Sequence, residues 1–458
     1  MEPLLNTEIS ESGGAFIDML CSEPLIAKNN DPELYLKYNV KRGLRNADGT
    51  GVVVGMTRVG DVRGYHIDDG DKIPEEGRLF FRGYNIYDIV SAVQREKRFG
   101  YEECCYLLLT GNLPDKTHLD ELKKYLGTHR QLPYGFTEDM IMKAPSRNLM
   151  NKIARSVMAS YSYDDNPDDT SLRNVYRQSL NLIAQLPTMA AYAYQAKAYY
   201  YDNRSLYIHS PQPELSTAEN ILYMLRPDSS FKQSEAEILD LALMVHAEHG
   251  GGNNSSFTMR VVSSTGTDTY AAVAAAINSL KGPKHGGANH RTVSMVDEMK
   301  QNISDINDKD QVYAYLLKIL RGEAFDGTGL VYGMGHAVYT LSDPRAVLLK
   351  KKAEEMAAET GREKEYKLLN LIEELTPSAY LEVRGKDNVK CANVDLYSGF
   401  VYSMLGIPTD LYTPIFAIAR LPGWCAHRLE ELNVDPKIIR PAYKNVCKPR
   451  PYKDIESR

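Results

Sequence analysis

Residues 234–256 read SEAEILDLALMVHAEHGGGNNSS. Ser234 and Glu237 have the spacing of a capping box, in which two side chains satisfy free amides at a helix start. The run at residues 238–245 is almost wholly apolar, which indicates a helix that is buried on most of its surface. We therefore predict a buried helix that ends in a histidine-containing turn before three glycines.

Helix signals of the same kind recur along most of the chain. Ser216 and Glu219 form a second predicted capping box. Asp343 and Pro344 have the residue types preferred at the N-cap and at the first helical position. Further helices are predicted at residues 101–110, 178–196, 271–280 and 345–359.

Strand signals are confined to residues 49–80. The run Val52–Val54 is β-branched, as is typical of a strand, and Gly70, Gly77 and several Asp residues indicate turns in the residues after this run. Strands and helices do not alternate, so no parallel sheet is indicated. The sequence therefore predicts an all-α protein with a short β segment near the N-terminus.

Composition and charge exclude several classes of protein. The chain has 458 residues, 43% of them hydrophobic, and its formal net charge is −6. Such a composition is typical of a folded globular protein, and a slightly acidic balance does not favour nucleic acid as a partner. The uncharged stretch at residues 178–196 contains Gln178, Asn181 and Pro187, which favours a buried helix over a membrane span.

The cysteines and the N-terminal residues bear on the compartment. The six cysteines form no Cys-x-x-Cys pair and are too sparse for a disulfide scaffold, so we expect free thiols. No basic residue precedes Lys28, which argues against a secretory signal and against a mitochondrial presequence. We therefore expect a cytoplasmic protein.

Histidines at glycine-rich turns are the first candidates for chemistry. His246 and His249 lie three residues apart, which departs from the spacing of a zinc-binding His-Glu-x-x-His helix, and no convincing third ligand is present. They fit either a helix C-terminus that favours histidine or an anion-binding histidine beside backbone amides. His285 is flanked by Pro283 and Gly286, and it is either a solvated loop residue or a neutral donor at a helix junction.

Two further segments carry candidate residues. Residues 327–339 read GTGLVYGMGHAVY, which is neither a Walker A motif nor part of a dinucleotide-binding fold. His336 and Arg345 are nine residues apart, so a turn and a helix start could bring them to one site. Asp395 is either a helix cap or a base, and Arg420 and Arg440 are either carboxylate-binding groups or surface charges.

Together, the order and spacing of these clusters resemble the citrate synthase family, which includes citrate and 2-methylcitrate synthases. The resemblance covers nearly the whole chain. It is carried by residues 82–84, 182–187, 246–253, 282–289, 333–345, 393–395 and 398–399, with Arg420 and the pair Arg440-Pro441.

The resemblance implies a two-domain helical fold in which a smaller domain closes over the substrates. It implies a large domain at residues 1–285, with an N-terminal extension over about 1–48. A small domain is expected at residues 286–394, followed by a return to the large domain and a C-terminal arm at 395–458. The family forms homodimers in which the partner subunit supplies one active-site arginine, here matched by Arg440.

The resemblance also implies an acyltransferase that condenses acetyl-CoA with oxaloacetate, as at the entry to the tricarboxylic acid cycle. Asp395 matches the family's base, His285 the donor to the thioester oxygen, and His336 the donor to the oxaloacetate ketone. The expected oxaloacetate-binding residues are His249, Asn253, Arg345, Arg420 and Arg440. The expected coenzyme A-binding residues are Leu330, Val331, Tyr332, Gly333, Met334, Gly335 and Asn393.

The chemistry of the family needs no metal and no redox cofactor, and coenzyme A enters as part of the substrate. Motifs do not separate acetyl-CoA from propionyl-CoA, because one methylene changes binding by only about 1–3 kcal/mol. A 2-methylcitrate synthase, or an enzyme that makes both products, is therefore the alternative. Thr340 also departs from the family, because some relatives have a basic residue there near the coenzyme A phosphates.

Overall fold

The computed structural model describes residues 11–21, 32–46, 48–69, 71–385, 391–434, 437–447 and 449–457. The chain divides into two compact units, one of residues 1–56 with 440–458 and one of residues 57–439. The first unit holds α1 (Glu11–Cys21), α3 (Pro32–Lys37) and the 3-10 turns η1 (Arg42–Leu44) and η5 (Ile455–Ser457). Every predicted site residue except Arg440 lies in the second unit. The predicted boundary between a large and a small domain stays a prediction.

The second unit begins with a small antiparallel sheet. Its strands are β1 (Gly60–Asp68), β2 (Asp71–Phe81) and β3 (Tyr84–Asn85), in the order β1-β2-β3. β1 pairs with β2 from Gly60 opposite Phe81 to Asp68 opposite Asp71. This hairpin confirms the β segment predicted near the N-terminus.

The predicted strand at Val52–Val54 is wrong, because these residues lie outside every strand of the described chain. Val53 is 89% exposed, so no packed surface holds the side chain in a sheet.

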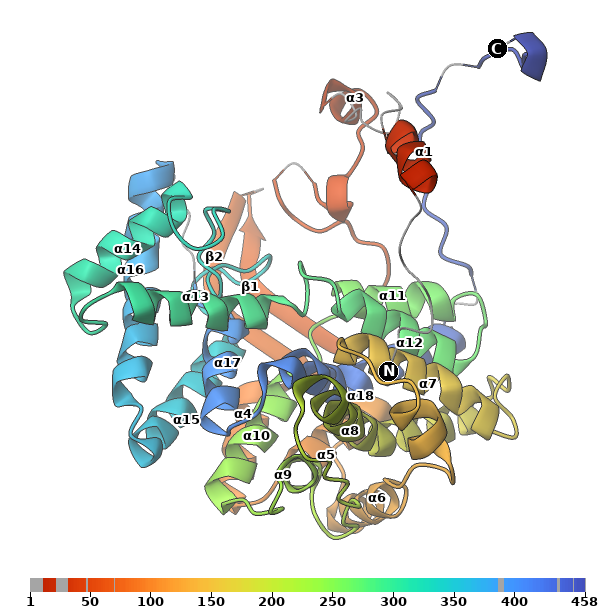
Figure 1. Ribbon diagram of the computed structural model, residues 1–458, viewed down its shortest axis with the longest axis vertical. Coiled ribbons are helices and arrows are strands. Elements are labelled where there is room, and N and C mark those ends of the chain that lie inside the picture. The colour runs from red at the N-terminus through yellow and green to blue at the C-terminus, as the bar shows by residue number, and fades with distance from the viewer. Residues whose placement is uncertain are drawn as a thin grey trace. The chain divides into compact units, whose positions relative to one another are not determined.

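Helices make up most of the second unit, as predicted. In Figure 1, α14, α15 and α16 lie at the left of this unit and α7, α11 and α12 at its right, with α8 and α18 between them. The helices are α4 (Ile86–Glu96), α5 (Tyr101–Thr110), α6 (Lys116–Thr128), the π-helix η2 (Thr137–Met142), α7 (Leu149–Ser160), η3 (Tyr161–Tyr163), α8 (Leu172–Asp202), α9 (Thr217–Leu225), α10 (Gln233–His246), α11 (Asn254–Ser263), α12 (Thr269–Leu280), α13 (Ala288–Asn302), α14 (Lys309–Arg321), α15 (Pro344–Thr360), α16 (Glu363–Arg384), α17 (Val394–Met404), η4 (Thr409–Leu411) and α18 (Tyr412–Val434).

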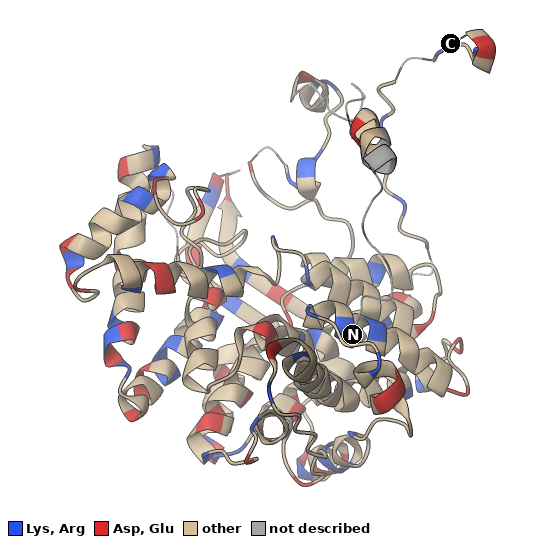
Figure 2. Ribbon diagram, in the orientation of Figure 1, with Lys and Arg blue, Asp and Glu red and all other residues tan. Residues whose placement is uncertain are grey.

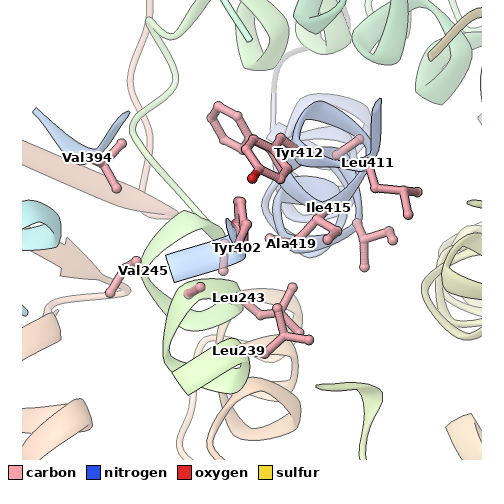
Figure 3. Packing of buried hydrophobic residues seen from close by; sticks show 14 of the residues in the cluster. Leu239, Leu243, Val245, Val394, Tyr402, Leu411, Tyr412, Ile415 and Ala419 are labelled. Atoms are coloured by element: carbon pink, nitrogen blue, oxygen red, sulfur yellow. The ribbon is translucent and has the colours of Figure 1, made fainter. Parts of the chain in front are cut away.

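The core is built around α18, which packs against α5, α8, α10 and α11. Nearly every residue of α18 up to Leu429 is buried, as expected for a helix that has neighbours on all sides. Figure 3 shows Leu239 and Leu243 of α10 close to Ile415 and Ala419 of α18. Because α10, α17 and α18 share this core, the residues at their ends are held in fixed positions.

The helix starts test the capping predictions. Ser216 and Glu219 form the predicted box at α9, and Asp343 caps α15 with Pro344 at its first turn. The predicted box of Ser234 with Glu237 is wrong.

α10 begins earlier, at Gln233, and its N-cap residue is Lys232, whose side chain makes no capping hydrogen bond. Glu235 accepts from the Lys232 amide at 2.7 Å and is also paired with Arg226. Ser234 instead donates to Glu359 of α15 at 3.1 Å. Glu235, and not Glu237, is therefore the acidic residue that bonds the backbone at the start of α10.

The remaining expectations from composition are tested in part. None of the helices in the described part of the chain is long and apolar enough to span a bilayer. All six cysteines have free thiols, as predicted. Figure 2 shows acidic and basic residues interspersed along the helices of the second unit.

Candidate active site

The C-terminal end of α10 delivers the first two histidines. His246 is buried, and its Nδ1 lies 2.7 Å from the carbonyl oxygen of Ala242, which only an N–H can bond. Burial lowers the pKa of His246 to about 3, so the ring is neutral. Gly250 then takes a positive φ of 82°, which turns the chain sharply after His249.

His249 is placed to bond a substrate. Its ring centroid is 5.1 Å from that of His336 and 5.5 Å from that of Tyr339. The Nε2 atom is buried and has no hydrogen-bond partner among the described residues. Burial, and then the charge of Arg345, hold the pKa of His249 well below its usual value, which leaves a neutral ring with an unused polar atom.

His285 lies in the turn between α12 and α13. Its Nε2 is 3.1 Å from the Ser255 hydroxyl and 3.2 Å from Oδ1 of Asn253, the residue that caps α11. Trp424 donates to the same hydroxyl at 3.1 Å, and the hydroxyl in turn donates to Oδ1 of Asn253 at 2.8 Å. Burial lowers the pKa of His285 to about 4, with Arg420 acting in the same direction. The ring is therefore neutral and held from one side.

His336 has a defined tautomer. Its Nδ1 accepts from the backbone amides of Val338 at 3.1 Å and Tyr339 at 3.0 Å. In a neutral imidazole an accepting Nδ1 leaves the proton on Nε2, so His336 presents a donor there. Gly333 and Gly335, with φ of 82° and 87°, allow the loop to fold into this turn.

The start of α17 is tied to the same loop. Gly335 donates to Cys391 at 2.7 Å and Asn393 donates to Gly333 at 2.9 Å, both through backbone amides. The Asn393 side chain donates to the Gly335 carbonyl and accepts from the Asp395 amide, both at 2.9 Å. Asn393, and not Asp395, is therefore the helix cap.

This arrangement leaves the carboxylate of Asp395 without a capping role. Burial raises the pKa of Asp395 to about 6, although the nearby charge of Arg345 opposes the shift. Asp343 adds to the rise by charge repulsion. A carboxylate with such a pKa is a stronger base than an ordinary aspartate and is still mostly ionised at pH 7.

Arg345 follows the α15 cap and is bound to it. Its Nε lies 3.0 Å from Oδ1 of Asp343 and its Nη2 lies 2.7 Å from Oδ2, so the pair is bidentate. Both side chains are buried. Burial opposes ionisation of Asp343, but Arg345 outweighs it and keeps the pKa of that carboxyl below its usual value.

Arg420 is fully buried in the middle of α18. Its Nε donates to the carbonyl oxygen of His246, and its guanidinium lies 4.9 Å from the centre of the Phe416 ring. Neither Nη1 nor Nη2 has a hydrogen-bond partner in the described part of the chain. A buried guanidinium with two unused nitrogens is suited to bind a carboxylate.

The loop predicted to bind coenzyme A contains both exposed and buried residues. Leu330 is 54% exposed, while Val331 is buried. Met334 pairs with Ala392 in an isolated antiparallel bridge. A Cβ at Gly333 would lie 3.0 Å from Leu396, so the loop is packed tightly against α17.

Thr340 takes part in a different interaction. Its hydroxyl donates to the carbonyl oxygen of Gly64 in the β1–β2 hairpin. The hairpin approaches so closely that a Cβ at Gly64 would lie 2.7 Å from Tyr339. Thr340 therefore fastens the loop of His336 to the hairpin.

The structure thus brings His249, His336, Arg345 and Arg420 to one buried region, with Asp395 close to Arg345. Arg440 lies in the other unit, and its role stays a prediction, as do the roles of the remaining candidates. Sequence reasoning missed several polar residues that support the site, namely Glu248, Ser255, Arg260, Asp343 as an ion-pair partner, and His427. Their sequence signal was weak, because each is an ordinary helix or turn residue whose partners are mostly distant along the chain.

Comparisons with known proteins agree with this arrangement. Residues 47–442 match the family model described as citrate synthase, C-terminal domain. Citrate synthase from Haloferax volcanii is 35% identical over 88% of this chain and 94% of its own length. Citrate synthase from Synechocystis is 34% identical over 82% of this chain and 85% of its own length.

Solved structures show the same fold. Citrate synthase from Pyrobaculum aerophilum superposes with a TM-score of 0.72 at 29% identity, covering 88% of this chain and 93% of the other. The Thermoplasma acidophilum enzyme, solved as a ternary complex with carboxymethyl coenzyme A and oxaloacetate, gives a TM-score of 0.73 at 24% identity, covering 91% and 99%. The chain belongs to the citrate synthase family and is an enzyme of its acyltransferase class.

Proposed function

We propose that this enzyme condenses acetyl-CoA with oxaloacetate and hydrolyses the resulting thioester to citrate and coenzyme A. The observation that carries the proposal is that a base at the start of α17 and a donor in the adjacent loop are held together by hydrogen bonds. Asp395, with a pKa near 6, and His336, with its proton on Nε2, are joined through Asn393, Gly333 and Gly335. The ternary complex of the Thermoplasma relative with a coenzyme A analogue and oxaloacetate is consistent with these substrates.

The first step is removal of a proton from the acetyl methyl group by the Asp395 carboxylate. Negative charge then develops on the thioester oxygen, and a neutral histidine can stabilise it by donating a hydrogen bond. We assign this role to His285, whose Nε2 lies within hydrogen-bonding distance of Ser255 and Asn253. The neutral state of His285 supports this assignment, since burial disfavours the charged ring.

The second step forms the carbon–carbon bond. The enol carbon attacks the ketone carbon of oxaloacetate, and His336 gives its Nε2 proton to the ketone oxygen, which becomes the hydroxyl of citrate. Arg345, Arg420, His249 and Asn253 hold the two carboxylates of oxaloacetate. Water then cleaves the thioester, which releases citrate and coenzyme A.

The proposal includes the wider context of the enzyme. We infer a cytoplasmic homodimer in which the partner subunit supplies a copy of Arg440, and a role at the entry to the tricarboxylic acid cycle. Residues 330–335 and Asn393 hold the adenine part of coenzyme A. No metal and no redox cofactor take part, because the proton transfers and the condensation need only the side chains named above.

The test is thiol release with oxaloacetate and either acetyl-CoA or propionyl-CoA at matched concentrations. We expect a higher kcat/KM with acetyl-CoA. A higher value with propionyl-CoA would identify a 2-methylcitrate synthase, and comparable values would identify an enzyme that makes both products. Absence of turnover with both thioesters would contradict the proposal.

A further inference from the structure

Glu248 stands between the two histidines of the α10 turn, and it is completely buried. Its Oε1 accepts from the Gly250 amide at 2.6 Å and lies 2.9 Å from Nε2 of His427. Its Oε2 is buried without a hydrogen-bond partner among the described residues. Leaving a carboxylate oxygen unpaired in the interior is costly, so this position requires an explanation.

Two glycines make room for the carboxylate. A Cβ at Gly60, the first residue of β1, would lie 2.7 Å from Cγ of Glu248. A Cβ at Gly423 of α18 would lie 2.5 Å from Oε2. Both distances are shorter than non-bonded contacts allow, so the sheet and α18 close on Glu248 only because they lack side chains there.

A chain of hydrogen bonds holds Glu248 from behind. Nδ1 of His427 accepts from Arg260, 3.2 Å from Nε and 2.8 Å from Nη2. An arginine only donates, so the His427 proton lies on Nε2 and points at Glu248. Arg260 is in turn paired with Glu430 and Glu431. Glu248 is therefore fixed as an ionised acceptor, and its pKa stays below the usual value despite burial.

The unpaired oxygen lies close to the substrate arginine. Gly423, where an added Cβ would lie 2.5 Å from Oε2, is three residues after Arg420 and therefore one helical turn away along α18. Burial lowers the pKa of Arg420 to about 9, and Glu248 is the leading group that opposes this shift. The carboxylate thus supplies the opposite charge that a buried guanidinium needs, without occupying Nη1 or Nη2.

We propose that Glu248 is a positioning residue for oxaloacetate, held by His427 and Arg260, that keeps Arg420 in place while leaving its terminal nitrogens free. The same carboxylate fixes the Gly250 turn, and so it also orients His249. The inference deepens the proposed function and rests on oxaloacetate being the substrate. It adds a residue that touches no reacting atom.

The decisive variant is Glu248→Gln, because the amide keeps the shape and the accepting oxygen but removes the charge. We expect the Kd and the KM for oxaloacetate to rise about 10-fold or more, since a buried arginine without its counter-charge leaves its position. The KM for acetyl-CoA should stay within about twofold. Calorimetric titration with oxaloacetate gives the Kd without relying on turnover.

Glu431→Gln is the matched control. It is the same substitution in the same hydrogen-bonded chain, but Glu431 contacts Arg260 and not Glu248. We expect its affinity for oxaloacetate to stay close to that of the wild type. Glu248→Asp keeps the charge with a shorter reach and should weaken binding less than Glu248→Gln does.

Three outcomes would overturn the proposal. An unchanged Kd in Glu248→Gln would mean that the charge has no role in binding, and a tighter Kd would mean that it only repels the dicarboxylate. Equal weakening of oxaloacetate binding in Glu248→Gln and Glu248→Asp would show that the shape of the side chain matters and its charge does not. Equal losses in every kinetic constant, together with a lower Tm, would indicate a purely structural role.

A crystal structure of Glu248→Gln without substrates tests the positioning separately from the activity. The Arg420 guanidinium should no longer contact the His246 carbonyl, and an unmoved guanidinium would contradict the proposal even if oxaloacetate is not the substrate. Failure of the wild type to bind oxaloacetate would instead contradict the proposed function.

Discussion

Two buried arginines serve the same proposed substrate, but their acidic neighbours are arranged differently. Arg345 forms a direct, bidentate ion pair with Asp343. Arg420 forms no ion pair with any described carboxylate, and the charge that acts on it, Glu248, packs against α18 at Gly423, one helical turn from Arg420. The difference shows two solutions to burying a cation beside a substrate site, one by contact and one at a distance.

The two solutions have different consequences. A direct pair satisfies both charges before any substrate arrives, so Arg345 is fixed in place at the start of α15. The distant carboxylate neutralises Arg420 only in part, and it leaves Nη1 and Nη2 unused. We therefore expect Arg420 to contribute more to oxaloacetate affinity, and Asp343 to contribute more to stability.

Removing the Arg420 guanidinium should have the largest effect. Arg420→Met keeps much of the volume, but it deletes two free donors and leaves Glu248 buried without a counter-charge. We expect the Kd for oxaloacetate to weaken about 100-fold or more, as for loss of a desolvated, charge-assisted pair. Calorimetric titration measures the Kd, and the circular dichroism spectrum checks that the variant is folded.

Phe416→Leu serves as the control for that variant, because it changes the ring beneath the Arg420 guanidinium but leaves both free donors in place. Its affinity for oxaloacetate should fall by less than about 30-fold, since such a cation–ring contact contributes only about 0.5–2 kcal/mol. A Kd for Arg420→Met within a few-fold of wild type would show that another group binds the carboxylate.

Removing the charge of Asp343 should destabilise the protein more than removing the charge of Glu248. Asp343→Asn removes one charge of a direct buried pair and leaves Arg345 uncompensated, which typically costs about 3–5 kcal/mol. Glu248→Gln should cost about 1–2 kcal/mol, because the amide oxygen still accepts from Gly250 and His427. Urea unfolding of both variants at pH 7 measures the loss in the free energy of unfolding. Equal losses would show that a direct ion pair and a more distant carboxylate contribute equally to stability.

Sequence reasoning predicted the parts of this comparison that depend on local pattern. The cap formed by Asp343 and Pro344, the buried helix before His246 and the glycine turns were all readable, because each depends on neighbouring residues. The resemblance to a family then indicated which histidines, aspartate and arginines to consider together.

The rest depended on contacts between distant segments. His427 lies 179 residues from Glu248 and 167 residues from Arg260 in sequence, so no local pattern links them. Burial also changes what a residue type means. Glu248, Arg260 and His427 would be ordinary surface residues on an exposed helix, and only the fold makes them a buried chain of hydrogen bonds.

The smallest expected effect is on the pH dependence of turnover. Asp395 must be ionised to accept a proton, so kcat should fall as pH drops below about 6. The charge of Asp343 raises the pKa of Asp395, and so Asp343→Asn should move this acid limb to lower pH, by less than about one unit. Glu248 is not among the charges that act on Asp395, and Glu248→Gln should leave the limb in place at saturating oxaloacetate. If the acid limb moved equally in both variants, Asp343 and Glu248 would affect the pKa of Asp395 alike. The proposed difference between the surroundings of Arg345 and Arg420 would then be wrong.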